Sequence, residues 1–163
     1  MLKKTITKEK ALLKLASLCA KSEQCEFEIT RKLINWGISS SDRNEIITYL
    51  KENKYIEDVR FAKSFANDKA RFSSWGPVKI KAELMRRKIK PAVIKEAIEN
   101  VSSLIWKEAL LKSVLSKGSK LELNGQEGYG NCQKLYRYLI GRGFSSGAAS
   151  KAVSFMKKKQ ESL

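Results

Sequence analysis

The sequence predicts an all-α protein in which three tandem three-helix repeats form a curved, elongated helical array. The first observation behind this prediction is an apolar pattern that occurs three times. In each copy two aliphatic residues four positions apart precede a turn and a second apolar cluster. The leading pairs are Ile29 and Leu33, Ile80 and Leu84, and Leu135 and Leu139. Each unit is too small to bury its apolar face alone, so neighbouring units must complete one another.

Two further observations favour a helical array. The chain has only two prolines among 163 residues, and both fall where a helix should start. Hydrophobic residues make up 42% of the sequence, which is enough for a core without disulfides. We divide the chain into residues 1–56, a first repeat with an N-terminal extension, then 57–101 and 102–163.

The first repeat is predicted to contain three helices. Thr7 is a suitable N-cap for a helix that ends near residue 20, and residues 24–36 carry the next apolar stripe. Asp42 and Glu45 have the spacing of a capping box, which predicts that a third helix starts at Asp42.

The later repeats follow the same plan. Asp58 is a candidate N-cap, and Pro77 and Pro91 should occupy first helical positions. The third repeat should start near Ser102 or Ser103. Its first core candidates are Leu104, Ile105, Leu110 and Leu111. Residues 118–130 contain four glycines and are predicted to form a flexible loop insertion that projects from the array.

Charge indicates a polyanionic partner. The 33 Lys and Arg residues outnumber the 17 Asp and Glu residues, so the net charge is +16. The excess rises from +4 in residues 1–56 to +5 in 57–101 and +7 in 102–163. A field of this size favours nucleic acid or another polyanionic surface as a partner.

Cysteine usage and hydropathy predict a cytoplasmic protein without membrane contact. Cys19, Cys25 and Cys132 are odd in number and lack Cys-x-x-Cys spacing, which favours reduced thiols packed as small apolar side chains. No apolar run approaches the roughly 20 residues needed to cross a bilayer. Lys14 interrupts residues 11–20, which makes them a poor signal-peptide core.

The residue types argue against an enzyme, a cofactor and a metal site. The chain has no histidine, which removes the commonest general base and a principal zinc ligand. Three cysteines cannot supply a four-cysteine zinc site. No phosphate-binding loop or serine nucleophile elbow is present. Glu57 and Asp58 are adjacent carboxylates, but they belong at a helix start, where they complement the dipole.

Basic residues off the apolar stripes are the candidate binding residues. On the helix after Pro77, Lys79 and Arg86 should project to one side and Lys81 and Lys88 to the opposite edge. Eight basic residues are nominated as binding sites for a partner or nucleic acid: Lys79, Lys81, Arg86, Arg87, Lys88, Lys134, Arg137 and Arg142. We expect all but Arg87 to line one continuous face.

Two features qualify this set. Arg87 falls near the Ile80 stripe, so its alkyl stem should cover the core while its guanidinium faces outward. Tyr136 and Tyr138 lie among the third-repeat cations, a mixture suited to the phosphates and stacked bases of a single strand. Aromatic residues at helical spacing are more often core, and that alternative stays open.

Two runs resemble the signature of the RecX regulatory proteins. They are residues 55–62, which read YIEDVRFA, and residues 75–89, which begin Trp-Gly-Pro. Residues 21–23 and 28–33 resemble the first-repeat part of that pattern. The similarity extends from about residue 8 to 158, and the glycine-rich insertion departs from it.

The resemblance implies a curved array of three-helix repeats that binds the groove of the RecA recombinase filament on single-stranded DNA. It implies inhibition of the RecA ATPase and of strand exchange, and so modulation of recombination and of the DNA-damage response. It also implies weak binding to DNA. We expect the protein to be a monomer and its binding to single-stranded DNA to be salt-dependent. The alternatives are a helix-turn-helix-like or non-specific DNA-binding protein and a protein-only helical adaptor. The resemblance supplies no catalytic residues.

Overall fold

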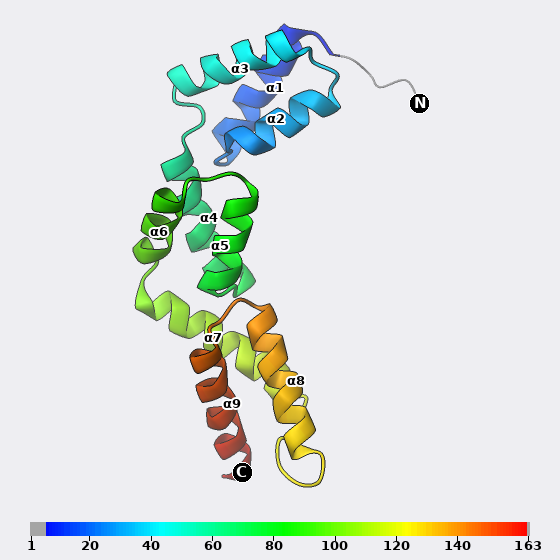
Figure 1. Ribbon diagram of the computed structural model, residues 1–163, viewed down its shortest axis with the longest axis vertical. Helices are drawn as coiled ribbons and strands as arrows, with labels where there is room; N and C mark the ends of the chain where they lie inside the picture. The colour runs from blue at the N-terminus through cyan, green and yellow to red at the C-terminus, as the bar shows by residue number, and fades with distance from the viewer. Residues whose placement is uncertain (1–5, 163) are drawn as a thin grey trace.

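The protein is an elongated stack of helices in which consecutive groups of three succeed one another along the long axis (Figure 1). The computed structural model describes residues 6–162, and this range contains nine helices and no strand. The helices are α1 (Lys8–Lys21), α2 (Glu26–Asn35), α3 (Ser40–Glu52), α4 (Asp58–Ser73), α5 (Pro77–Arg86), α6 (Pro91–Asn100), α7 (Ser103–Gly118), α8 (Gly128–Gly141) and α9 (Ser146–Glu161). The predicted fold class, an all-α array of three three-helix repeats, is confirmed.

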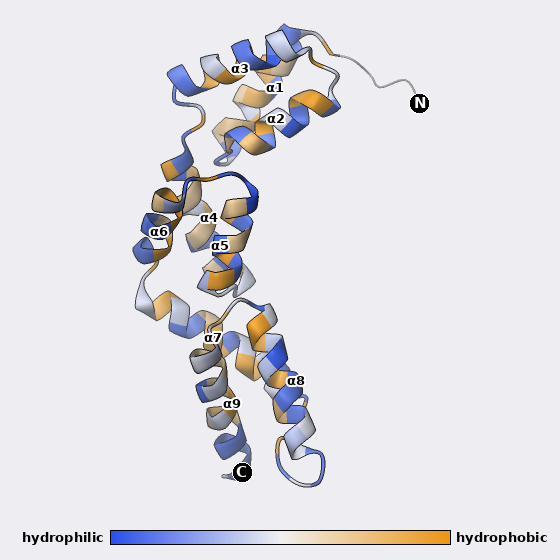
Figure 2. Ribbon diagram, in the orientation of Figure 1, coloured by the Kyte–Doolittle hydropathy of each residue, from blue (hydrophilic) through white to orange (hydrophobic). Residues whose placement is uncertain are grey.

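The buried apolar residues form three separate cores. The helices carry both hydrophobic and hydrophilic residues along their length (Figure 2). The first, second and third cores contain the repeated pairs Ile29 and Leu33, Ile80 and Leu84, and Leu135 and Leu139. All six side chains are completely buried. Equivalent sequence positions are therefore buried in the core of each repeat.

The turn after the middle helix is also the same in each repeat. Gly37, Lys88 and Gly143 adopt positive φ angles of 74°, 59° and 93°. The following N–H groups, of residues 38, 89 and 144, donate to the carbonyls of residues 33, 84 and 139 at 3.1–3.2 Å. This 6→1 hydrogen bond after a left-handed residue is a Schellman-type end. Lys88 adopts in the second repeat a conformation that favours glycine.

The cores do not coincide with the unit boundaries drawn from the sequence. Cys25, at the start of α2, and Ile105, in α7, belong to the second core. Phe27 packs against the same core. Adjoining repeats therefore share apolar side chains, and the boundaries at residues 56/57 and 101/102 stay predictions.

Several local predictions are corrected. Ser39 caps α3, since its Oγ accepts from Asp42 N at 3.1 Å, so Asp42 lies inside the helix. Asp58 is the first residue of α4 and Glu57 occupies the N-cap position without a capping hydrogen bond. Leu104 and Leu111 are 63% and 45% exposed, because the buried face of α7 instead carries other residues. Those residues are Ile105, Ala109, Ser113, Val114 and Gly118.

The segment between α7 and α8 is docked on the third core, which corrects the prediction of a projecting loop. Leu123 is completely buried. Its N–H donates to Gln160 Oε1 at 2.9 Å, and Gln160 Nε2 donates to the carbonyl of Leu121 at 2.8 Å. Asn131 Nδ2 donates to the carbonyl of Glu122 at 2.8 Å. The insertion therefore completes a core instead of leaving it.

Candidate partner and nucleic-acid interface

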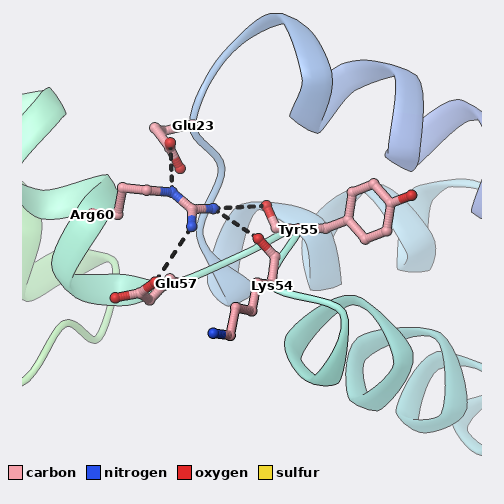
Figure 3. Close-up of polar contacts among 5 residues, drawn as sticks. All are labelled: Glu23, Lys54, Tyr55, Glu57 and Arg60. Carbon is pink, nitrogen blue, oxygen red and sulfur yellow. Dashed lines mark hydrogen bonds and ion pairs between the residues drawn. The ribbon is translucent and has the colours of Figure 1, made fainter.

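Arg60 joins the first repeat to the second (Figure 3). Its Nε donates to Glu23 Oε1 at 2.6 Å, and its Nη2 donates to the carbonyl of Lys54 at 2.9 Å and that of Tyr55 at 3.4 Å. Nη1 lies 3.3 Å from Glu57 Oε2. The hydrogen bond that Arg60 donates to Glu23 is the main reason that the pKa of Arg60 is raised. One guanidinium thus holds the connection between α1 and α2 against the connection between α3 and α4.

Arg87 makes a second ionic link between the same repeats. Its Nε donates to Glu28 Oε1 in α2, and its Nη1 to Glu83 Oε2 in α5, both at 2.9 Å. The guanidinium carbon also lies 4.8 Å from the centre of the Phe65 ring. Burial acts to lower the pKa of Arg87, but the hydrogen bonds to the two carboxylates outweigh it and raise the pKa. The expectation that this guanidinium faces outward is wrong.

Removing the Arg87 link should destabilise the protein. In Arg87→Met the partly buried carboxylate of Glu28 loses its partner, and that of Glu83 keeps only its contact with Arg86. We expect a loss of roughly 1–3 kcal/mol in the free energy of unfolding, measured by urea denaturation. Arg86→Met is the matched control, because the neighbouring side chain is 73% exposed and should change stability by less than about 0.5 kcal/mol. Equal effects of the two substitutions would show that the link contributes nothing.

The junction between the second and third repeats is made by backbone. Gly76 N donates to the carbonyl of Arg142 at 2.7 Å, and Val78 N donates to the carbonyl of Gly143 at 3.0 Å. A Cβ on Gly76 would lie 2.3 Å from Gly143 O, and a Cβ on Gly143 would lie 2.4 Å from Lys79 Cβ. Arg142 Nη2 adds a hydrogen bond to the carbonyl of Ser73. Two glycines therefore allow the start of α5 to contact the turn after α8.

Four of the nominated cations lie along one side of α5 and one side of α8. Lys79 and Arg86 are seven residues apart on α5, and Lys134 and Arg137 are three apart on α8, so each pair shares one side of its helix. Lys79 and Lys134 hold the same repeat position, one residue before the first buried aliphatic of the pair. We call these four residues the basic stripe.

Within the basic stripe, Arg86 and both α8 cations are exposed, and Lys79 is partly buried. Lys79 Nζ lies 4.4 Å from the centre of the Trp75 ring, and Lys69 Nζ lies 5.0 Å from it. Arg86 Nη2 is 3.3 Å from Glu83 Oε1. The stripe therefore includes a cation–π contact beside the second junction. Lys69 and Trp75, which take part in this cluster, were not predicted as binding residues from the sequence.

The other nominated residues lie elsewhere. Lys81 lines a groove with α6 residues such as Pro91 and Ile98, on the opposite edge of α5. Lys88 lines a pocket at the first junction that also contains Glu26 and Asp58. Arg87 and Arg142 are drawn into the two junctions by their hydrogen bonds. The structure therefore distributes the eight residues over two edges and two junctions, so the seven residues expected to line one continuous face do not all share it.

The cysteines pack as apolar side chains. Cys25 is completely buried in the second core, and Cys19 and Cys132 are partly buried against the first and third cores. Burial raises the pKa of the Cys25 thiol to about 11. Within residues 6–162 no group of three or more Cys, Asp or Glu side chains is placed to hold a metal ion. None of the helices in this range is long and apolar enough to span a bilayer.

The fold and the candidate interface define an all-helical tandem-repeat protein with basic edges. A family model described as the second three-helix domain of RecX matches residues 58–98. Regulatory protein RecX from Clostridium beijerinckii is 30% identical over 133 residues, which cover 82% of this chain and 62% of that protein. RecX from Vibrio parahaemolyticus is 26% identical over 151 residues, covering 93% and 92% of the two chains.

Two solved structures share the fold. A crystal structure of regulatory protein RecX superposes with a TM-score of 0.73 at 21% identity, covering 93% of this chain and 71% of that one. The crystal structure of RecX from Lactobacillus salivarius gives a TM-score of 0.69 at 17% identity, with 96% and 97% covered. These two likenesses show the shared fold, and the sequence matches show that the chain is similar to RecX regulatory proteins over most of its length. The chain spans 55–62% of the length of the clostridial relatives it matches first.

Proposed function

We propose that this protein binds the RecA recombinase filament on single-stranded DNA and inhibits its ATPase and strand-exchange activities. The similarity to RecX regulatory proteins, which includes a match to the second three-helix domain of RecX, supports a regulator of this type. The resemblance of residues 55–62 and 75–89 to RecX proteins implies that the partner is RecA. In this proposal the protein acts as a monomer in the cytoplasm and modulates recombination and the DNA-damage response.

The observation that supports this function best is the basic stripe. Lys79 and Lys134 hold equivalent positions in two adjoining repeats, and Arg86 and Arg137 add a second cation on the same side of each helix. The backbone junction between Gly76 and Gly143 holds these repeats together. A repeated cationic edge on an elongated molecule is complementary to a filament groove that presents acidic side chains and phosphates at intervals.

Co-sedimentation with RecA filaments, combined with an ATPase assay, tests the function. Filaments assembled on single-stranded DNA with no free strand remaining should carry the protein into the pellet, and their ATP hydrolysis should fall as the protein is added. Inhibition seen only while free DNA is limiting would contradict filament binding and leave a protein that sequesters DNA.

The alternatives make different predictions for DNA alone. Contacts from Lys and Arg to phosphate should make the logarithm of the affinity for single strands fall linearly with the logarithm of salt concentration, with a slope of about −0.7 per neutralised phosphate. A strong preference for one duplex sequence would favour a helix-turn-helix-like regulator. Complete absence of salt-dependent binding would favour a protein-only adaptor.

A further inference from the structure

A polar pocket of ≈ 320 Å³ lies where α4, α7 and α8 meet. Its position beside the second junction is fixed by the backbone hydrogen bonds of Gly76 and by the bond from Arg142 to the Ser73 carbonyl. The lining residues come from the end of α4, from α7 and from the end of α8. They are Phe72, Ser73, Ser74, Lys112, Ser113, Ser116, Tyr138 and Arg142.

The charge of this lining distinguishes the pocket from the others along the array. It contains two cations, Lys112 and Arg142, and no carboxylate. Lys117 adds a third cation nearby, with Nζ 5.9 Å from the centre of the Tyr138 ring. Four other pockets in the described part of the chain each include at least one Asp or Glu. An anion therefore meets attraction here without a neighbouring carboxylate to oppose it.

The hydrogen-bonding groups of the pocket suit a phosphate. Arg142 uses Nη2 for the Ser73 carbonyl, but its Nε is buried without a hydrogen-bond partner. A guanidinium has five N–H donors, so this side chain retains capacity for an oxyanion. Lys112 and Ser116 are exposed and stand one helical turn apart on α7, so an ammonium and a hydroxyl project from the same side.

The pocket also has an aromatic side chain with no core role. Phe72 is 82% exposed, which is unusual for a phenylalanine in a helix whose other phenylalanines, at 61 and 65, pack in the second core. A ring that is open to solvent beside cations and hydroxyls combines the two elements of single-strand recognition, a stacking surface and phosphate ligands. Neither Phe72 nor Lys112 was among the binding residues predicted from the sequence.

We propose that this junction pocket binds one nucleotide of a single-stranded DNA segment, with the base stacked on Phe72 and the phosphate held by Lys112 and Arg142. The proposal rests on the salt-dependent single-strand binding expected alongside the proposed function, and assigns that binding a specific site. In this proposal the Arg142 guanidinium makes two contacts, one with the Ser73 carbonyl at the junction and one with the DNA strand. Because the pocket is built from two repeats, a bound strand would cross their junction and run beside the basic stripe.

Fluorescence anisotropy with two labelled strands tests the pocket. The strands are a 20-nucleotide oligo-dT and an abasic strand of the same length, which has the phosphates but no bases. Phe72→Ala should weaken oligo-dT binding about tenfold and leave abasic binding unchanged, because stacking on one ring is lost. Phe72→Leu, which keeps apolar bulk, should give the same loss. Tyr129→Ala is the matched control, since Tyr129 is 81% exposed on α8 outside the pocket.

Lys112→Ala tests the phosphate contact. This variant should weaken both strands alike and reduce the salt slope by about 0.7. Lys107→Ala, an exposed lysine on the same helix outside the pocket, is the control and should leave the slope unchanged. Circular dichroism and melting temperature should match wild type for all five variants.

The outcomes separate the pocket from the proposed function. If wild type binds oligo-dT but the Phe72 and Lys112 variants behave like their controls, the pocket proposal is overturned and the DNA-binding function stands. An equal loss of oligo-dT and abasic binding in Phe72→Ala overturns base stacking. If wild type binds neither strand at low salt, DNA binding itself fails together with the pocket, while co-sedimentation still decides RecA binding.

Discussion

Gly143→Ala should destabilise the protein by about 2–5 kcal/mol, because the new methyl group meets two penalties at once. The residue has φ +93°, a conformation that an L side chain rarely adopts. Its Cβ would also lie 2.4 Å from Lys79 Cβ and 2.5 Å from Lys79 N, so the start of α5 would have to move away. That movement would break the hydrogen bonds from Gly76 N and Val78 N that close the second junction.

Gly141→Ala is the matched control, two residues earlier at the end of α8. A Cβ there meets nothing within 4 Å, and the residue is helical, so alanine should be neutral or stabilise by up to about 1 kcal/mol. Urea denaturation followed by circular dichroism provides the comparison. A Gly143→Ala protein as stable as Gly141→Ala would mean that the second junction is loose in solution.

The fold could be predicted from the sequence because its determinants are local and repeated. The spacing of Ile80 and Leu84 predicts a buried helix face, and both residues have counterparts in the other repeats. Pro77 predicts a helix start, because proline favours the first helical position. The predicted N-cap of α3 was wrong, and the reason is also local. Ser39 and Asp42 offer overlapping caps, and spacing alone does not choose between them.

The junctions could not be predicted in the same way, because they depend on residues far apart in the chain. Arg87 donates to Glu28, which lies 59 residues earlier in the chain, and Arg142 donates to the carbonyl of Ser73, 69 residues earlier. On a helical wheel both arginines are basic residues at the margin of an apolar stripe, which predicts a solvated head group. The carboxylate and the carbonyl that draw them inward become visible only when the repeats are stacked.

The candidate site was predicted in part. Helix geometry predicted Lys79 and Arg86 on one side of α5 and Lys81 on the other, and in the structure Lys79 contacts Trp75 while Lys81 lines the groove with α6. Sequence alone did not identify Phe72, which stands seven residues after Phe65 and so has the periodicity of a core residue. It is exposed because it lies in the last turn of α4, beyond the apolar residues that cover the rest of the stripe. The binding roles of all eight nominated cations stay predictions.

Reversing the charge of two residues of the basic stripe, Arg86→Glu with Arg137→Glu, should abolish inhibition of the RecA ATPase. The stripe then carries two carboxylates where the proposed contacts need cations, and like charges across an interface repel. Both side chains are exposed, so the fold should survive. Each change should alter the free energy of unfolding by less than about 0.5 kcal/mol, including the new repulsion between Glu83 and residue 86.

The matched control is Lys158→Glu with Lys159→Glu, which changes the net charge by the same amount at the exposed end of α9. Both double variants are compared with wild type on RecA filaments already assembled on DNA with no free strand, so competition for DNA does not contribute. We expect the α9 variant to inhibit nearly as well as wild type and the stripe variant not at all. Equal loss in the two variants would show that total charge governs inhibition, and full inhibition by the stripe variant would exclude the stripe as the contact. Only a loss confined to Arg86 and Arg137 fits recognition by one edge of the array, because net charge and fold are then the same in both proteins.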